Sequence, residues 1–157
     1  MLIWLWLSLI VLVLDQVTKR IVDTSMALGD SIPLLPMFQL TYLRNQGAAF
    51  SFLSGAGGWQ RWFFIALAIS ASVFICYWVR KLPKDRSLEA CAWALVLGGA
   101  LGNLIDRIIY GYVIDFLDVF YGNWHWPAFN VADSAITVGV VILFIDSFIH
   151  RPETAKS

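Results

Sequence analysis

The sequence predicts an all-α, polytopic membrane protein with four transmembrane helices in one domain, residues 1–157. Hydrophobic residues make up 59% of the chain and charged residues 14%, which leaves too little polar surface to coat a soluble globule of this size. Four apolar stretches, each about 21 to 23 residues long, match the ~30 Å thickness of a bilayer core at a helical rise of about 1.5 Å per residue. The stretches cover residues 2–22, 59–79, 88–110 and 129–149.

The polar residues inside these stretches gather toward one face of the membrane. Successive helices alternate in direction, so the end of the first, the start of the second, the end of the third and the start of the fourth share one side. The polar side chains on that side are Asp15, Lys19, Asn103, Asp106, Arg107, Asn130 and Asp133. An ionisable side chain at mid-bilayer costs about 2.5 to 3.5 kcal/mol on insertion scales, so this grouping predicts a structural or functional site at one membrane surface.

Basic residues in short segments predict the orientation. Four of them lie between the second and third stretches: Arg80, Lys81, Lys84 and Arg86. Such a loop is typical of the cytoplasmic side, and His150, Arg151 and Lys156 in the tail agree with it, whereas Lys19 and Arg20 oppose it. We therefore expect both termini in the cytoplasm, the polar residues near the outer surface, and a first stretch that is retained rather than removed as a secretory signal.

The composition argues against several partners and chemistries. The formal net charge is +0 and no long basic tract is present, which argues against a nucleic acid partner. The two histidines, His125 and His150, occur without a His-Glu-x-x-His pattern, so we expect no metal site and no cofactor. Cys76 and Cys91 lie inside apolar stretches, where packing is a better explanation than a disulfide or a reactive thiol.

Two segments are expected outside the bilayer on the outer side. The first, residues 24–58, has too many prolines and glycines for one long helix, and the alternation of apolar and polar residues in 38–42 is typical of a strand. The second, residues 111–127, has six aromatic residues around Asp115 and Asp118. We expect it to be an interfacial loop, because aromatic side chains favour the headgroup region.

The third stretch combines polar and small residues. Asn103, Asp106 and Arg107 are spaced so that they share one helical face. A structural ion pair of Asp106 with Arg107 explains these two charges at least as well as direct chemistry does. Gly98 and Gly102 form a small-xxx-small pair, which predicts the close approach of another helix.

Two further pairs of polar residues have structural explanations. Asp15 and Lys19 are four residues apart, and we expect them to form an ion pair. Asn130 is a candidate N-cap of the fourth helix. Asp133 would then lie in the first turn, where the helix dipole favours its negative charge.

Asp115 differs from the other carboxylates. It interrupts an apolar run just outside the third stretch, and no basic residue lies within several positions. Its natural partner is Asp133 across the second outer segment. Two carboxylates held together in a partly dry site tend to share one proton, which supplies a general acid and a general base for hydrolysis of an amide. The spacing alone does not show that the two meet.

Five short motif blocks follow one another along nearly the whole chain. They are Asp15-Gln-Val-Thr-Lys19, Asn45-Gln-Gly47-Ala48-Ala49-Phe50, Gly102-Asn103-Leu-Ile-Asp106-Arg107, Val113-Ile-Asp115-Phe116 and Phe129-Asn130-Val-Ala132-Asp133-Ser134. Together they resemble the motif blocks of bacterial lipoprotein signal peptidase, also called signal peptidase II. We see no departure from the family pattern at these positions.

The resemblance implies an aspartyl endopeptidase of the bacterial cytoplasmic (inner) membrane. It would remove the signal peptide from prolipoproteins whose cysteine carries a diacylglyceryl group, cutting just before that cysteine. Carried over by position, the catalytic dyad is Asp115 and Asp133. The positions implied to support the dyad or bind substrate are Asp15, Lys19, Asn45, Gly47, Asn103, Asp106, Arg107, Asn130 and Ala132.

The resemblance also carries expectations about shape and ligands. The first outer segment should form a small extracytoplasmic β-cradle, and the second should cross over the active site. The implied partners are the lipid-modified prolipoprotein, membrane lipid and a globomycin-type cyclic peptide inhibitor.

Two other classes of function remain open at this stage. A small proton-coupled transporter or channel subunit also uses intramembrane carboxylates, although a proton relay should cross the membrane and these carboxylates gather at one face. A noncatalytic assembly factor held together by its glycine-containing helices is the other alternative. Cleavage of a lipidated precursor peptide in proteoliposomes would separate the three.

Overall fold

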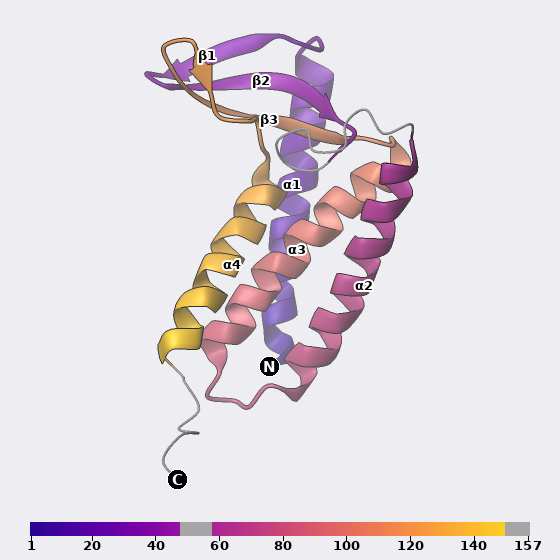
Figure 1. Ribbon diagram of the computed structural model, residues 1–157, viewed down its shortest axis with the longest axis vertical. Helices are drawn as coiled ribbons and strands as arrows, with labels where there is room; N and C mark the ends of the chain where they lie inside the picture. Colours follow the sequence, from indigo (N-terminus) through magenta and orange to yellow (C-terminus); the bar gives the residue numbers. More distant parts are fainter. Residues whose placement is uncertain (48–57, 150–157) are drawn as a thin grey trace.

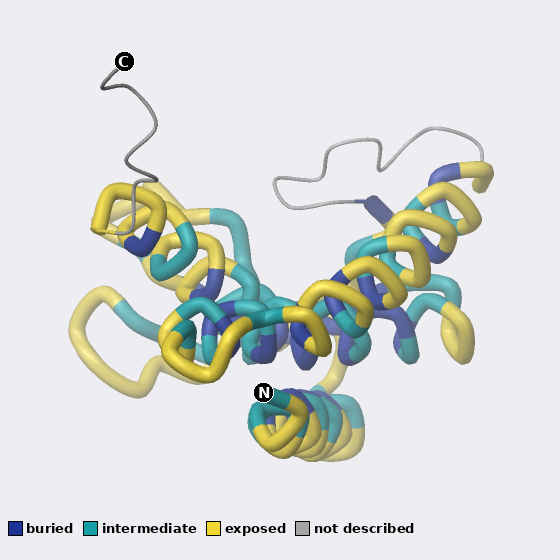
Figure 2. Tube along the Cα trace, turned by 90° about the horizontal axis from the view of Figure 1, so that it is seen from below, coloured by how far each residue is buried: buried dark blue, intermediate teal, exposed yellow. Residues whose placement is uncertain are grey.

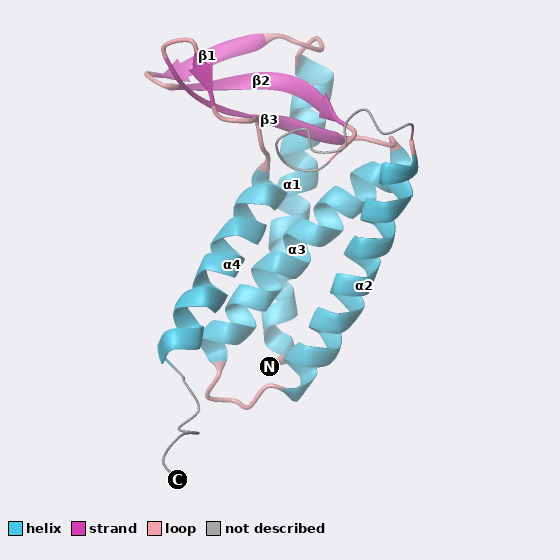
Figure 3. Cartoon of the chain, in the orientation of Figure 1, coloured by secondary structure: helices cyan, strands magenta, loops and turns pink. Residues whose placement is uncertain are grey.

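The computed structural model describes residues 1–47 and 58–149 of the chain. A bundle of helices carries a small sheet over one end (Figure 1), and Figure 3 shows the same view coloured by secondary structure. The helices are α1 (Leu5–Ser25, after the 3-10 turn η1, Leu2–Trp4), α2 (Trp59–Lys81), α3 (Ser87–Ile109) and α4 (Val131–Ile149). All four are long and apolar enough to cross a membrane, which confirms the expected class of fold.

Helix α3 lies at the centre of the bundle and packs against the other three helices. Half of the residues in the most apolar 18-residue segment of α3 are buried (50%). The corresponding fractions are 22%, 17% and 22% for α1, α2 and α4. Figure 2 shows the buried residues facing the middle of the bundle and the exposed ones facing outward. Many of the exposed residues are large and apolar, including Trp6, Ile10, Trp62, Phe74 and Phe144. Such a surface suits acyl chains and not water.

The small-residue pair on α3 permits the expected close approach, and its neighbour is α1. A Cβ placed on Gly98 would lie 2.7 Å from both the Ser8 carbonyl oxygen and the Val11 Cβ. A Cβ on Gly102 would lie 2.5 Å from Asp15 Oδ2. A side chain at Gly98 would therefore push the helices apart, and one at Gly102 would displace the Asp15 carboxylate.

The sheet contains four antiparallel strands in the order β1-β2-β3-β4. They are β1 (Ser31–Leu35), β2 (Phe38–Asn45), β3 (Val113–Tyr121) and β4 (Trp124–His125). The strand expected at 38–42 is thus confirmed and extends to Asn45. The expectation of a loop over 111–127 was wrong for most of that segment, because β3 pairs with β2, which lies about seventy residues earlier in the chain. A strand partner so far away in the chain cannot be predicted from the local sequence pattern.

A buried apolar cluster attaches the sheet to the helices. Val22 of α1 packs with Tyr42 of β2 and with Ile114 and Phe116 of β3. The Tyr42 hydroxyl also donates a hydrogen bond to the Asp23 carboxylate at the end of α1. These contacts hold β3 directly over the ends of the helices that carry the polar residues.

The opposite end of the bundle contains the chain start and the basic loop (Figure 1). Arg86 of that loop lies 2.7 Å from Asp146 of α4 and 2.8 Å from Glu89 of α3. The ion pair with Arg86 explains the buried acidic residue Asp146 at this end of the bundle. The basic tail residues His150, Arg151 and Lys156 lie outside the described residues.

Candidate active site

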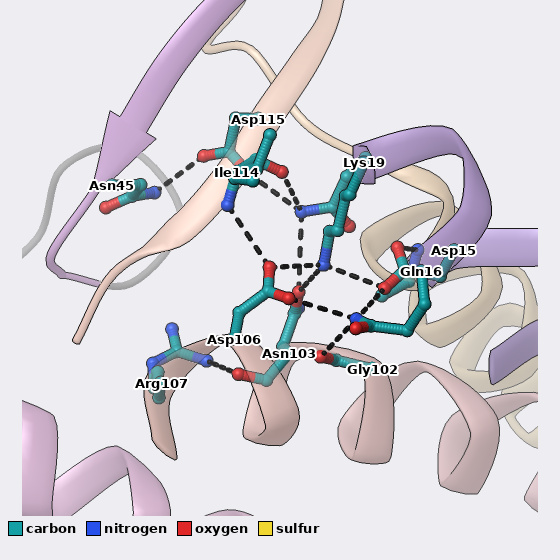
Figure 4. A network of polar contacts seen from close by, with 12 residues as sticks. Asp15, Gln16, Lys19, Asn45, Gly102, Asn103, Asp106, Arg107, Ile114 and Asp115 are labelled. Atoms are coloured by element: carbon teal, nitrogen blue, oxygen red, sulfur yellow. Dashed lines mark hydrogen bonds and ion pairs between the residues drawn. The ribbon is translucent and has the colours of Figure 1, made fainter. Parts of the chain in front are cut away.

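A buried lysine is the centre of the polar layer. Lys19 Nζ lies 2.8 Å from Asp15 Oδ2 and 2.9 Å from Asp106 Oδ2, and it donates a 2.9 Å hydrogen bond to Asn103 Oδ1 (Figure 4). The ion pair expected between Asp15 and Lys19 is confirmed. The ion pair considered for Asp106 with Arg107 does not form, because adjacent helix positions point about 100° apart and Asp106 faces Lys19 of α1.

The two carboxylates of this cluster also hold the backbone of neighbouring elements. Asp15 Oδ1 accepts a 2.9 Å hydrogen bond from the Ala132 N–H in the first turn of α4. Asp106 Oδ2 accepts a 3.2 Å hydrogen bond from the Ile114 N–H on β3. The cluster therefore fixes the two segments that carry Asp133 and Asp115.

Asp115 on β3 is buried and hydrogen-bonded through both carboxylate oxygens. The Asn45 amide donates to Oδ2 at 2.9 Å, and the Asn130 amide donates to Oδ1 at 2.8 Å. Burial raises the pKa of Asp115 to about 7, and the nearby charge of Asp133 adds to this, against the lowering effect of the two amide donors. A carboxyl group with this pKa exchanges its proton near neutral pH, as a general acid or base should.

Asp133 occupies the first turn of α4, as expected. Its own N–H donates a 2.9 Å hydrogen bond to Asn130 Oδ1, so Asn130 caps the helix as the sequence predicted. Its carboxylate accepts a 2.8 Å hydrogen bond from the Asn103 amide. Asn103 thus links the Lys19 cluster to Asp133, and Asn130 links Asp133 to Asp115.

Both carboxylates lie on the wall of one cavity. It has a volume of about 460 Å³ and runs from Asp115 and Asp133 along an apolar face of α4, past Ile136 and Val138. The sequence left open whether the two residues meet, and the structure brings them together. The combination of two carboxylates, amide donors and an apolar cavity wall suits hydrolysis of a bond in a partly apolar substrate.

Arg107 connects the site to the end of β2. Its guanidinium donates to the Gly47 carbonyl at 3.0 Å and to the Asn103 carbonyl at 3.3 Å, and it lies over the Phe64 ring. Arg107 therefore positions the segment that follows Asn45. The remaining residues of that motif block, 48–50, lie outside the described residues.

The structure adds one residue that the analysis of the sequence did not single out. Gln16 donates to Asp106 Oδ1 at 3.0 Å and to the Gly102 carbonyl at 3.1 Å. Its position between Asp15 and Lys19 in the first block was the available signal. Ala132 is completely buried where α4 passes Gly102, so its small side chain permits the contact between α3 and α4.

Within residues 1–47 and 58–149, no group of three or more His, Cys, Asp or Glu side chains is placed to hold a metal ion.

Comparison with known proteins decides the family. The family model described as signal peptidase (SPase) II matches residues 7–149. The chain belongs to the signal peptidase II family. It is therefore a membrane-embedded protease, which decides against the transporter and the assembly factor considered above.

Relatives in the signal peptidase II family cover nearly the whole chain. A lipoprotein signal peptidase of Pseudoalteromonas translucida is 56% identical over 147 residues, covering 94% of this chain and 89% of the relative. One from Acinetobacter baumannii (strain SDF) is 54% identical over 156 residues, covering 99% and 89%. A solved bacterial membrane enzyme superposes with a TM-score of 0.84 at 33% identity, covering 98% of this chain and 94% of the other.

Proposed function

We propose that this member of the signal peptidase II family cleaves prolipoproteins just before a diacylglyceryl-modified cysteine, with Asp115 and Asp133 as the catalytic pair. The observation that carries the proposal is that the two carboxylates share one cavity, which opens along the apolar face of α4. The names of the relatives, which are lipoprotein signal peptidases, support this class of substrate.

The proposed reaction uses one proton shared by the two carboxyl groups. The ionised group takes a proton from a water molecule, and the water oxygen attacks the carbonyl carbon of the scissile amide. The protonated group donates its proton to the carbonyl oxygen, which gives a tetrahedral diol. The carboxyl group that took the water proton then donates it to the amine nitrogen as the C–N bond breaks, while the other carboxylate takes a proton back from the diol. The products are a free carboxylate on the signal peptide and a free amine on the lipidated cysteine.

The shape of the site supports a substrate that is already in the membrane. Ile136 and Val138 line the cavity below Asp133 on α4, a membrane-spanning helix. We infer that the signal helix and acyl chains enter sideways from the bilayer and lie against this face. Binding energy from the remote lipid then orients the scissile bond against the carboxylates.

The supporting residues have roles that follow from their contacts. Lys19, with Asp15 and Asp106, fixes the backbone of α4 and β3. Asn45 and Asn130 hold the Asp115 carboxylate. Asn103 donates a hydrogen bond to Asp133, and Arg107 with Gly47 positions the end of β2. Ala132 permits close helix packing.

We further propose the bacterial inner membrane as the location, with both termini in the cytoplasm and the sheet on the outer side. The basic loop 80–86 supports this orientation, since it lies at the opposite end of the bundle from the sheet (Figure 1). A globomycin-type cyclic peptide should compete with substrate, because it would occupy the same cavity.

The test is cleavage of a synthetic diacylglyceryl-modified precursor peptide by the purified full chain in proteoliposomes. Asp115→Asn and Asp133→Asn should each reduce turnover by at least about 10³-fold, because one carboxyl group cannot supply both proton transfers. Asp85→Asn, in the exposed loop at the far end, is the matched control and should cleave normally. Substantial turnover by either dyad variant would refute the assignment.

A further inference from the structure

A second cavity lies over the sheet and adjoins the proposed catalytic site. It has a volume of about 610 Å³, and its wall shares Asn45, Asp115 and residues 126–128 with the cavity along α4. The two cavities therefore meet at Asp115. For a peptide whose signal helix lies along α4, with its scissile bond at Asp115, the second cavity is the adjoining space for the residues that follow the bond.

A β-bulge turns a second carboxylate into this cavity. Side chains alternate between faces along a strand, so Asp115 and Asp118 should point to opposite sides of β3. Both line the cavity, however. The N–H groups of Phe116 and Leu117 both donate to the Phe129 carbonyl, at 3.0 and 2.8 Å, which is the two-against-one pairing of a bulge.

Asp118 holds an imidazole in a defined orientation. Asp118 is 5% exposed, and its carboxylate accepts hydrogen bonds from Gln39 at 2.7 Å and Thr41 at 3.1 Å. His125 Nδ1 lies 2.9 Å from Asp118 Oδ2, and its ring stacks on Phe120 at 5.4 Å between centroids. With Nδ1 committed to Asp118, the half-exposed ring has Nε2 left for a ligand.

The net charge of this pair depends on the protonation state of the imidazole. Burial alone would raise the pKa of Asp118, but the hydrogen bonds from Gln39, His125 and Thr41 outweigh it and lower the pKa, so the group stays ionised near neutral pH. The pair then carries one negative charge when the imidazole is neutral and none when it is protonated. The other charged residues on the cavity wall are Asp115 and Arg44, and Arg44 donates to the Tyr42 hydroxyl at 2.9 Å.

We propose that the cavity over the sheet binds the substrate segment that follows the lipidated cysteine, and that His125 with Asp118 selects among its side chains by charge. The inference rests on the proposed function. With a neutral imidazole the subsite favours basic or hydrogen-donating side chains. With a protonated imidazole it favours acidic ones.

The test compares two lipidated peptides that differ only in having Lys or Asp after the cysteine, with a second series varied one position further on. Both side chains keep their charge between pH 6 and 8. The same carboxylates cleave both peptides, so their effect on turnover cancels in the ratio of kcat/KM for Lys over Asp. Asp115 also lines the cavity, and a variant without the imidazole measures its separate effect on the ratio. From pH 8 to pH 6 this ratio should fall by about threefold to fivefold in at least one series.

His125→Gln should remove the part of this change that the imidazole causes, and the change that remains measures the effect of Asp115 on the same cavity wall. Asn123→Gln, an exposed substitution in the same hairpin, should keep the pH dependence of the unchanged protein. A ratio that stays constant in both series, or that changes equally with and without His125, would overturn the inference while leaving the peptidase assignment intact. If neither peptide is cleaved at any pH, the proposed function itself has failed.

Discussion

Lys19→Met is the substitution that tests the polar layer most directly. It replaces an ammonium group that is 2% exposed and lies within 2.9 Å of two carboxylates, which are themselves 0% and 1% exposed. Methionine fills similar volume but has neither charge nor donor. Asp15 and Asp106 would remain as buried charges without their shared cation, and Asn103 Oδ1 would lose its 2.9 Å donor.

The expected loss of stability is large. Removing one member of a buried ion pair typically costs about 3 to 5 kcal/mol, because the remaining charge keeps its desolvation penalty. Two carboxylates are affected here, so we expect the upper part of that range. Activity should fall as well, since Asp15 and Asp106 hold the backbone N–H groups of Ala132 and Ile114, next to the proposed catalytic pair.

The free energy of unfolding can be measured by reversible denaturation in mixed micelles. The neighbouring Arg20 is a natural control, because its side chain is 65% exposed and its ion pair with Asp23 lies at the surface. Arg20→Met should cost no more than about 1 kcal/mol. Adding Asp15→Asn and Asp106→Asn to Lys19→Met should recover part of the loss. Equal costs for Lys19→Met and Arg20→Met, or no recovery, would refute the reasoning.

Three other predictions concern the pH response, helix packing and topology. Because the pKa of Asp115 is raised from 3.8 to about 7 in the folded state, its contribution to stability falls as pH rises through this range. The unfolding free energy of Asp115→Asn relative to the unchanged protein should therefore increase between about pH 4 and pH 7, by up to about 4 kcal/mol, and a constant difference would contradict the shift. Gly102→Ala would place a Cβ 2.5 Å from Asp15 Oδ2 and should cost about 1 to 3 kcal/mol in the same denaturation assay, whereas a negligible cost would argue against the close helix contact. With both native cysteines replaced, a cysteine at Lys84 should be protected from a membrane-impermeant thiol reagent in intact cells and one at Asn123 should react, and the reverse pattern would invert the proposed orientation.

Several features follow from the sequence because they depend on residues close together along the chain. The helices follow from apolar length, so α1 to α4 appear where the stretches predict them. The Asn130 cap and the Asp15 with Lys19 pair involve spacings of three and four residues, which one helical turn brings together. The small-residue pair on α3 predicted a close helix neighbour without saying which helix it would be.

The tertiary structure alone decided the contacts between distant segments. Asp106 pairs with Lys19 on another helix and not with its sequence neighbour, because the direction of each side chain depends on how α1 and α3 are packed. Strand β3 forms because it pairs with the edge of β2. The bulge opposite Phe129 turns Asp118 toward the same cavity as Asp115.

The proposed catalytic pair combines both kinds of information. The motif blocks identified Asp115 and Asp133 as candidates, but their positions depend on backbone hydrogen bonds to carboxylates of two other helices. A motif records which side chains are present at which spacing. Whether two of them share a cavity depends on packing and hydrogen bonds between segments up to 117 residues apart, and these form only when the whole bundle has assembled.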